Sequence, residues 1–342
     1  MLEHGGRLRA AARQYDIPLA DWIDLSTGIN PDTYQVPALD PLCWNRLPED
    51  DDGLEEAAAS YYGNDRLLVL PGSQAGIQGL PATFKPQMIA CVAPIYEEHP
   101  HAWDRAGHKV RRLPTLARAL SSMTPLVPVC NPCNPTATLT SREALVDAAG
   151  QLRRRGGWLI VDEAFGDAEP EHNVVDLAGS DAAPNLLVLR SLGKFFGLAG
   201  ARVGFLFGAA EKREPIREMI GPWPLSHPSR VVARQALLDA AWQVPARKRL
   251  ADSSQRLAEA LLPLGEVART ALFCTVRTER ATELAGYFAR HAILVRHFNA
   301  HQLLRFGLPG TENEWQRLTS AIAGLVAGEP LALLDAADGL HR

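Results

Sequence analysis

Five short apolar segments, separated by helix-like stretches, limit the possible folds of this chain more than any other feature. They are residues 67–70, 88–92, 126–129, 158–161 and 186–189. A strand that is apolar throughout is typical of a parallel sheet covered by helices on both faces, because neither face meets water. Strands that alternate with helices therefore predict an α/β fold with a mainly parallel sheet. Ser141 or Thr140 offers the N-cap of one such helix, which we expect to end near Arg155.

The pattern changes after about residue 208, where prolines precede a long helical stretch. We expect this stretch to run from 229 to about 264, with a break near Pro245. Two short strands and a final helix follow, at residues 272–277, 292–295 and 311–327. These elements indicate a smaller α+β domain. We predict an N-terminal arm at 1–30, a large domain at 31–220 and a small domain at 221–342. The arm packs with the small domain or across a partner subunit, and the sequence does not decide between the two.

Composition excludes several classes of partner. The 342 residues include 35 basic and 39 acidic side chains, a net charge of −4, so no overall positive field attracts nucleic acid or an anionic membrane. We find no apolar run of the roughly 18–20 residues that span a bilayer, and no segment typical of a signal peptide. We therefore expect a soluble cytoplasmic protein. Five scattered cysteines do not suggest a disulfide framework. The Cys130-x-x-Cys133 pair raises a zinc or redox alternative, but we expect packed thiols and no metal.

The residues that follow the predicted strands carry the chemistry. In open α/β sheets, ligands bind at the carboxyl ends of the strands. Gly72-Ser73-Gln74 follows the first strand and begins a helix, which suits a phosphate, although Ser73 could also be a simple N-cap. Asn134 follows the third strand and Asp162 the fourth, where a carboxylate next to buried residues needs a partner. Ser191 and Lys194 follow the fifth.

Lysine is scarce in this chain, with five against thirty arginines. Lys194 lies between glycines and phenylalanines, and a lysine among apolar side chains loses its proton more easily and becomes more nucleophilic. The alternative is a surface lysine. The other four are expected to be solvated: Lys85, Lys109, Lys212 and Lys248. A phosphate-binding turn, an asparagine, a carboxylate and a nucleophilic lysine together match the requirements of pyridoxal 5'-phosphate.

With these motifs in this order, the chain resembles the fold-type I pyridoxal-phosphate enzymes of the aspartate aminotransferase superfamily over almost its whole length. The resemblance implies that Lys194 forms the covalent link to the cofactor and that Asp162 pairs with its pyridine nitrogen, and these are the two predicted catalytic residues. The implied cofactor-binding residues are Gly72, Ser73, Gln74, Tyr96, Asn134, Asp162, Ser191, Lys194 and Arg202. Ala137, Phe165 and Gly193 depart from the family, which commonly has glycine, tyrosine and serine there. Family members place the active site at a subunit boundary, so we expect a homodimer.

Within the superfamily, the chain is similar to the histidinol-phosphate aminotransferase branch. Three segments resemble the threonine-phosphate decarboxylases of the cobalamin pathway: residues 3–6, 24–31 and 193–200. This resemblance implies conversion of L-threonine O-3-phosphate to (R)-1-amino-2-propanol O-2-phosphate and carbon dioxide. The cofactor motifs serve transamination equally, so an aminotransferase of the histidinol-phosphate type is the alternative, and a binding protein without cofactor is a third reading.

A substrate with a carboxylate and a phosphate needs two anion sites of its own. Arginine offers bidentate geometry to either anion. The candidate substrate-binding residues are His4, Asn30, Asn134, Arg296 and Arg305. We expect the other histidines, including His99 and His101, to lie on the surface.

Overall fold

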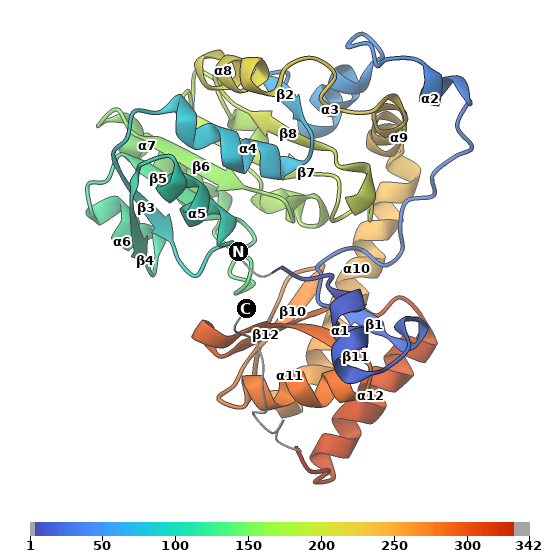
Figure 1. The fold of residues 1–342 in the computed structure, drawn as a ribbon. Helices are drawn as coiled ribbons and strands as arrows, with labels where there is room; N and C mark the ends of the chain where they lie inside the picture. The colour runs from blue at the N-terminus through green and yellow to red at the C-terminus, as the bar shows by residue number, and fades with distance from the viewer. Residues whose placement is uncertain (1–3, 332–342) are drawn as a thin grey trace. The chain divides into compact units, whose positions relative to one another are not determined.

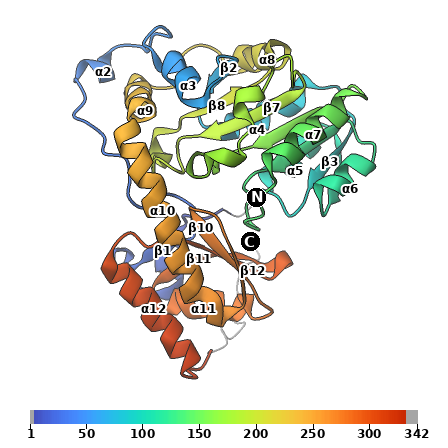
Figure 2. The same cartoon turned by 180° about the vertical axis from the view of Figure 1, so that it is seen from behind.

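The computed structural model describes residues 4–331, and the chain divides into two compact units. The central unit is Asp32–Leu250, and the terminal unit combines Met1–Pro31 with Ala251–Arg342. Figures 1 and 2 show the elements of each unit from opposite sides. The three-part division at residues 30 and 220 that the sequence suggests stays a prediction. No helix in the described part of the chain is long and apolar enough to cross a membrane.

The central unit is built on a seven-stranded sheet in the order β2-β8-β7-β6-β5-β3-β4. Its strands are β2 (Leu67–Leu70), β3 (Met88–Val92), β4 (Lys109–Leu113), β5 (Leu126–Cys130), β6 (Trp158–Asp162), β7 (Leu186–Ser191) and β8 (Gly204–Phe207). The five predicted strands are confirmed, and all of the sheet is parallel except β8, which runs antiparallel to β2 and β7. Two strands of this sheet were not predicted. β4 is a polar edge strand whose side chains are mostly exposed, and β8 is fully buried.

Helices cover this sheet on both faces. Figure 1 shows α4 and α5 in front of the sheet, whereas Figure 2 shows α7 in front of it. The helices are α2 (Leu42–Asn45), α3 (Leu54–Tyr62), α4 (Ser73–Gly79), α5 (Glu98–Arg105), α6 (Leu116–Ser121), α7 (Arg142–Arg153), α8 (Ala210–Ile220) and α9 (His227–Leu238). The Ser141 hydroxyl accepts a hydrogen bond from the Ala144 amide at 3.2 Å, which confirms the predicted N-cap of α7. Apolar side chains from α4, α5 and α8 pack against the sheet in one continuous core.

The predicted break near Pro245 is wrong. The chain breaks at Asp239, between α9 and α10 (Ala240–Leu261), and Pro245 lies inside α10. The buried Gln243 side chain donates hydrogen bonds to the carbonyls of Ala236 and Leu237, at 2.8 and 3.0 Å. These bonds satisfy carbonyls that the end of α9 leaves without helical partners, which stabilises the break at this point.

The terminal unit contains a five-stranded sheet in the order β1-β11-β12-β10-β9. Its strands are β1 (Ile23–Leu25), β9 (Glu266–Arg269), β10 (Phe273–Arg277), β11 (Ile293–Phe298) and β12 (Leu303–Gly307), and its helices are α1 (Leu8–Tyr15), α11 (Ala281–Arg290) and α12 (Glu312–Val326). The predicted final helix is confirmed as α12, which begins with a capping box between Thr311 and Glu314. β1 pairs in parallel with β11, so within one chain the N-terminal segment packs on the small sheet.

Candidate active site

The topology of the central unit brings the predicted cofactor residues to one edge of the sheet. β2, β7, β6, β5 and β3 all run in the same direction, so their carboxyl ends lie at the same edge. The antiparallel β8 begins there, with Gly204 opposite both Leu70 and Ser191. The predicted residues that follow or end these strands, or precede β8, are Gly72, Ser73, Gln74, Tyr96, Asn134, Asp162, Ser191, Lys194 and Arg202.

Two glycines form a cradle at the start of α4. Gly72 has a positive φ of 77°, and a Cβ atom there would lie 2.4 Å from the Arg202 guanidinium. A Cβ at Gly204 would lie 2.4 Å from the Ser73 amide nitrogen. The absence of both side chains therefore lets a cationic group and the first amide of α4 come close together. Arg202 is exposed and adopts a left-handed conformation with φ 53°, which is rare outside glycine and common at functional sites. The cradle suits an anion.

A buried carboxylate that the sequence analysis missed holds Gln74. Glu98 is 8% exposed, and its Oε2 accepts hydrogen bonds from the side-chain amides of Gln74 and Gln78, at 2.8 and 2.9 Å. The Tyr96 hydroxyl lies 3.5 Å from Gln74 Oε1. Glu98 therefore fixes Gln74, and Gln74 in turn orients the aromatic ring of Tyr96.

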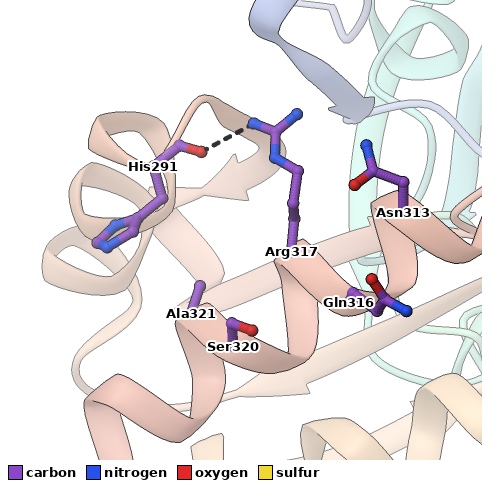
Figure 3. Close-up of a pocket in the computed structure, with 6 residues that line it drawn as sticks. All are labelled: His291, Asn313, Gln316, Arg317, Ser320 and Ala321. Carbon is purple, nitrogen blue, oxygen red and sulfur yellow. Dashed lines mark hydrogen bonds between the residues drawn. The ribbon is translucent and has the colours of Figure 1, made fainter.

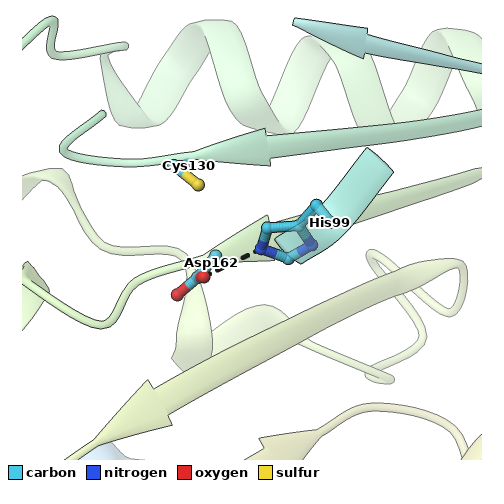
Figure 4. A group of neighbouring side chains, drawn as sticks. All are labelled: His99, Cys130 and Asp162. Atoms are coloured by element: carbon cyan, nitrogen blue, oxygen red, sulfur yellow. Dashed lines mark hydrogen bonds and ion pairs between the residues drawn. The ribbon is translucent and has the colours of Figure 1, made fainter. Parts of the chain in front are cut away.

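Asp162 is buried, and its partner is His99. The His99 Nε2 atom lies 2.8 Å from Asp162 Oδ2 (Figure 4), and the Ala164 amide donates to Oδ1 at 3.0 Å. His99 is only 2% exposed, so the prediction of a surface position is wrong for it, as it is for His108 at 3%. His101 is exposed, as expected. A histidine in the first turn of an amphipathic helix gives little sign of its partner, since the packing of α5 on the sheet decides where its ring lies.

Cys130 lies beside His99 and Asp162 (Figure 4). One potential ligand atom from each of the three side chains lies within 4.8 Å of the other two. Burial raises the pKa of the Cys130 thiol well above its usual range, and the neighbouring Asp162 raises it further. Burial also raises the pKa of Cys133, whose thiol donates to the Pro94 carbonyl. Thiol redox chemistry needs the thiolate, which burial of both residues disfavours. Both cysteines are buried and free of disulfide bonds, and the expectation that they bind no metal stays a prediction.

Lys194 is half-buried, and its amine lies 5.5 Å from the centre of the Phe165 ring. The Ser191 hydroxyl accepts a hydrogen bond from the Gly193 amide at 3.3 Å, which tightens the turn between β7 and Lys194. The expectation that the remaining lysines are solvated is wrong for Lys212. Its amine donates to the Thr83 carbonyl and lies 3.9 Å from the Phe84 ring centre, and burial lowers its pKa.

Asn134 lies half-buried in the loop after β5, and its bond to Pro135 is cis. Ala137, where relatives commonly have glycine, has a positive φ of 58°. A β-carbon in this conformation costs about 1 kcal/mol, so the departure from glycine is tolerated with some strain. The loop is closed by hydrogen bonds between Cys133 and the backbone of Ala137 and Thr138.

The predicted substrate-binding arginines belong to the terminal unit. Arg296 on β11 and Arg305 on β12 are directly opposite each other in the antiparallel register. Side chains in such a pair project from the same face of the sheet, so two positive charges lie side by side. Arg305 is 6% exposed and donates to the Ser26 carbonyl at 2.6 Å. The guanidinium carbons of Arg296 and Arg305 lie 5.2 and 5.8 Å from the Phe298 ring centre.

The other two predicted substrate residues differ in burial. Asn30 is 2% exposed, whereas His4 is exposed. A separate pocket in the terminal unit is open and polar, and contains none of the predicted site residues (Figure 3). Its lining residues are His291, Asn313, Gln316, Arg317, Ser320 and Ala321. Arg317 donates there to the backbone carbonyls of Asp21 and His291, so its charge already serves to hold neighbouring segments.

Comparison with known proteins identifies the family. Residues 44–322 match the model of the class I and II aminotransferases, which is most of the chain. The chain belongs to the class I and II aminotransferase family. The chain is also 48% identical to threonine-phosphate decarboxylase of Pseudomonas aeruginosa, over 95% of its own length and 98% of that protein. A threonine-phosphate decarboxylase of Sinorhizobium is 36% identical, over 94% of this chain and 97% of the relative.

Solved structures of this family share the fold. The crystal structure of histidinol-phosphate aminotransferase from Sinorhizobium meliloti, in complex with pyridoxal-5'-phosphate, superimposes with a TM-score of 0.77. The match covers 95% of this chain and 96% of that chain, at 18% sequence identity. The predicted fold class, a mainly parallel sheet covered by helices with a smaller α+β part, is thereby confirmed.

Proposed function

We propose that this protein is a pyridoxal-phosphate-dependent carboxy-lyase that converts L-threonine O-3-phosphate to (R)-1-amino-2-propanol O-2-phosphate and carbon dioxide, a step of cobalamin biosynthesis. The observation that carries the proposal is the 48% identity to a threonine-phosphate decarboxylase over nearly the full length of both chains. The homodimer and the cytoplasmic location expected from the sequence stay predictions.

The residues at the edge of the central sheet fit the cofactor. The cradle formed by Gly72 and Gly204 lets the Arg202 guanidinium approach the start of α4 closely, and we assign Arg202, Ser73, Gln74 and Ser191 to the cofactor phosphate. Asp162, held by His99, would pair with the pyridine nitrogen, since a fixed buried carboxylate needs a cationic partner. Tyr96 would stack on the ring, Asn134 would donate to its oxygen, and Lys194 would bind the aldehyde.

When bound, the cofactor supplies an electron sink that accepts the electron pair of the bond broken at the substrate's Cα. The protein residues decide which bond that is. For decarboxylation, the bond between Cα and the carboxylate must stand perpendicular to the plane of the cofactor ring. The placement of the substrate's two anions sets this orientation. Lys194 then delivers a proton to Cα, where the carboxylate has left.

The terminal unit offers cations for those anions. Arg296 and Arg305 lie side by side on one sheet face, and two neighbouring like charges are stabilised when an anion lies between or beside them. We assign Arg296 and Arg305 together to the two anions of the substrate, its carboxylate and its phosphate. Asn30, Asn134 and His4 complete the proposed set of substrate contacts.

Product analysis tests the function. The purified protein, loaded with pyridoxal phosphate, is incubated with L-threonine O-3-phosphate in the absence of any 2-oxo acid. Sustained release of carbon dioxide together with aminopropanol phosphate is the expected result. Stoichiometric conversion of the cofactor to its pyridoxamine form, with no carbon dioxide, contradicts the proposal and favours the alternative, an aminotransferase of the histidinol-phosphate type.

The aminotransferase alternative is supported by a histidinol-phosphate aminotransferase of Haemophilus influenzae that is 28% identical over 81% of this chain. Both reactions use the same cofactor residues, so the site at the sheet edge does not separate them. An absence of the Schiff-base absorbance after loading would contradict both functions and favour a binding protein, whereas its persistence in Lys194→Ala would contradict the assignment of Lys194.

A further inference from the structure

A buried ion cluster lies behind the proposed active-site edge, and the sequence analysis did not anticipate it. Arg190 is 1% exposed, and the side chains of Glu163 and Asp167 are fully buried. One Arg190 nitrogen lies 2.7 Å from Glu163 Oε2, and the other is hydrogen-bonded to Asp167 Oδ1. We call these three residues the arginine clamp.

The clamp occupies the opposite sheet face from Asp162 and Ser191. Glu163 follows Asp162 and Arg190 precedes Ser191, and side chains of neighbouring strand residues point to opposite faces. Asp162 meets His99 of α5, whereas Arg190 lies 4.7 Å from the ring centre of Tyr62 on α3. The clamp therefore links the carboxyl ends of β6 and β7 on the sheet face opposite to the one that carries Asp162.

The same cluster fixes the turn that carries Phe165. Both carboxylates of the clamp flank this residue, at positions 163 and 167, and the Gly166 amide donates to the Glu163 carbonyl at 2.9 Å. A Cβ at Gly166 would lie 2.7 Å from the Arg190 guanidinium, so glycine allows the close approach. The segment 163–167 is thus bound at each end to one buried guanidinium.

Two further contacts hold this segment. The Asn173 side chain donates to the Gly166 carbonyl at 2.8 Å, and Arg247 donates to the Asp167 carbonyl at 2.9 Å. The other Glu163 oxygen accepts the Val174 amide at 2.6 Å. This concentration of polar contacts in a buried turn is a costly way to gain stability, since apolar side chains of similar volume often stabilise as well. A role in positioning accounts for it better.

We propose that Arg190 is a positioning residue for Lys194. By binding Glu163 and Asp167 it fixes segment 163–167, and so holds the Phe165 ring against the Lys194 amine, where the ring lies 5.5 Å away. The aromatic face stabilises a nearby ammonium and restricts its access to water. The inference rests on the proposed role of Lys194 in the reaction.

Competitive acetylation of the full-length protein, freed of cofactor, tests the proposal. The labelling rate of each lysine is measured against pH by mass spectrometry, and exposed Lys85 and Lys248 serve as internal references. In Arg190→Met and in Phe165→Leu we expect Lys194 to be labelled about tenfold faster, because both changes remove the ring from its amine. The reference lysines are expected to keep their rates.

A double-mutant cycle separates positioning from general destabilisation. If Arg190 acts through Phe165, then Arg190→Met adds no further change to Lys194 in the Phe165→Leu background. Arg230→Met is the matched control, since Arg230 is also 1% exposed and pairs with carboxylates, those of Asp50, Asp52 and Glu55. It is expected to lower stability without changing the labelling of Lys194.

Unchanged labelling of Lys194 in Arg190→Met, fully additive effects in the double variant, or the same change in Arg230→Met would overturn the proposal. If Arg190→Met does not fold, Asp167→Asn removes one ion pair and is expected to accelerate Lys194 labelling by a smaller factor. Carbon dioxide release from threonine phosphate is measured on the same wild-type preparation. If the wild type releases carbon dioxide but Arg190→Met leaves the labelling of Lys194 unchanged, only the positioning role is contradicted. If the wild type is inactive, the proposed function is contradicted.

Discussion

The two sheets of this protein carry their predicted functional residues in different ways. In the central unit, these residues stand at or beyond the ends of strands, at the one edge where five strands point the same way. In the terminal unit, the two arginines lie inside neighbouring antiparallel strands and meet through their register. Residues at a shared edge come together in any parallel sheet, whereas residues within strands meet only if one particular pairing forms.

The electrostatics of the two sheets also differ. The buried Asp162 has a fixed partner in His99, and the buried Arg190 has two in Glu163 and Asp167. Arg296 and Arg305 lie opposite each other in the strand register, with aromatic rings beside them. The buried ion pairs of the central unit hold its own parts in place, and two neighbouring arginines suit the anionic substrate of the proposed function.

The largest effect is expected at the edge of the central sheet. Lys194→Ala should lower turnover by at least about a thousandfold, because the variant lacks both the nucleophile and the proton donor. Lys212→Ala is the control, since Lys212 is also half-buried but lies against Thr83 and Phe84. Carbon dioxide release measures turnover, and circular dichroism checks that both variants are folded. Persistent activity of Lys194→Ala would refute its assignment.

A substitution at Gly72 tests the cradle at the carboxyl edge of the central sheet. In Gly72→Ala the new methyl group would collide with the Arg202 guanidinium, so we expect cofactor affinity to fall by about 10- to 100-fold, as the loss of one or two charge-assisted hydrogen bonds implies. Gly156→Ala is the matched control, because Gly156 has a similar φ of 69° and nothing lies within 4 Å of its Cβ position. Equal cofactor affinities in the two variants would contradict a phosphate site beside Gly72.

The two arginines of the terminal sheet are expected to differ. Arg305→Met should raise KM for threonine phosphate by about 100-fold, and Arg296→Met by about tenfold, because an ion pair made by a buried arginine is less screened by water. Steady-state kinetics of both variants provide the measurement. Equal and small changes in KM would indicate that the pair does not bind the substrate.

The smallest effect concerns the pH dependence of stability at the arginine clamp. Burial raises the pKa of Glu163 to about 7, although Arg190 opposes the shift. The clamp has one guanidinium and two buried carboxylates, so two ionised carboxylates leave an excess negative charge. This excess charge favours protonation of Glu163 and agrees with its raised pKa. Between about pH 4.5 and pH 7 the folded state then holds more protons at this site than the unfolded state, so the free energy of unfolding falls as pH rises.

Glu163→Gln should remove this contribution, which amounts to at most about 3 kcal/mol over that range. Denaturant unfolding of wild type and variant at pH 5 and pH 7.5 measures the difference between their slopes. Glu279→Gln, at an exposed position, is expected to follow the wild type. A wild-type slope equal to that of Glu163→Gln would contradict the raised pKa.

Much of the central unit follows from local sequence. The five strands and the N-cap of α7 were predicted because apolar runs and a serine before a helix act over a few residues. The edge strand β4 was missed since its polar residues carry no buried-strand pattern, and the break after α9 was misplaced because the side chain of Gln243, not Pro245, stabilises it.

By itself, the sequence determined that the chain is an α/β protein of the pyridoxal-phosphate type, with a predicted phosphate-binding turn, a carboxylate and an amine at the ends of three strands, β2, β6 and β7. These features need only strand direction and local chemistry. The tertiary structure alone decided that His99 is the partner of Asp162, that Arg190 holds the turn around Phe165, and that Arg296 faces Arg305. Such contacts join residues from 9 to 63 positions apart, and only the packing of helices on the sheet and the register of its strands bring them within a few ångströms.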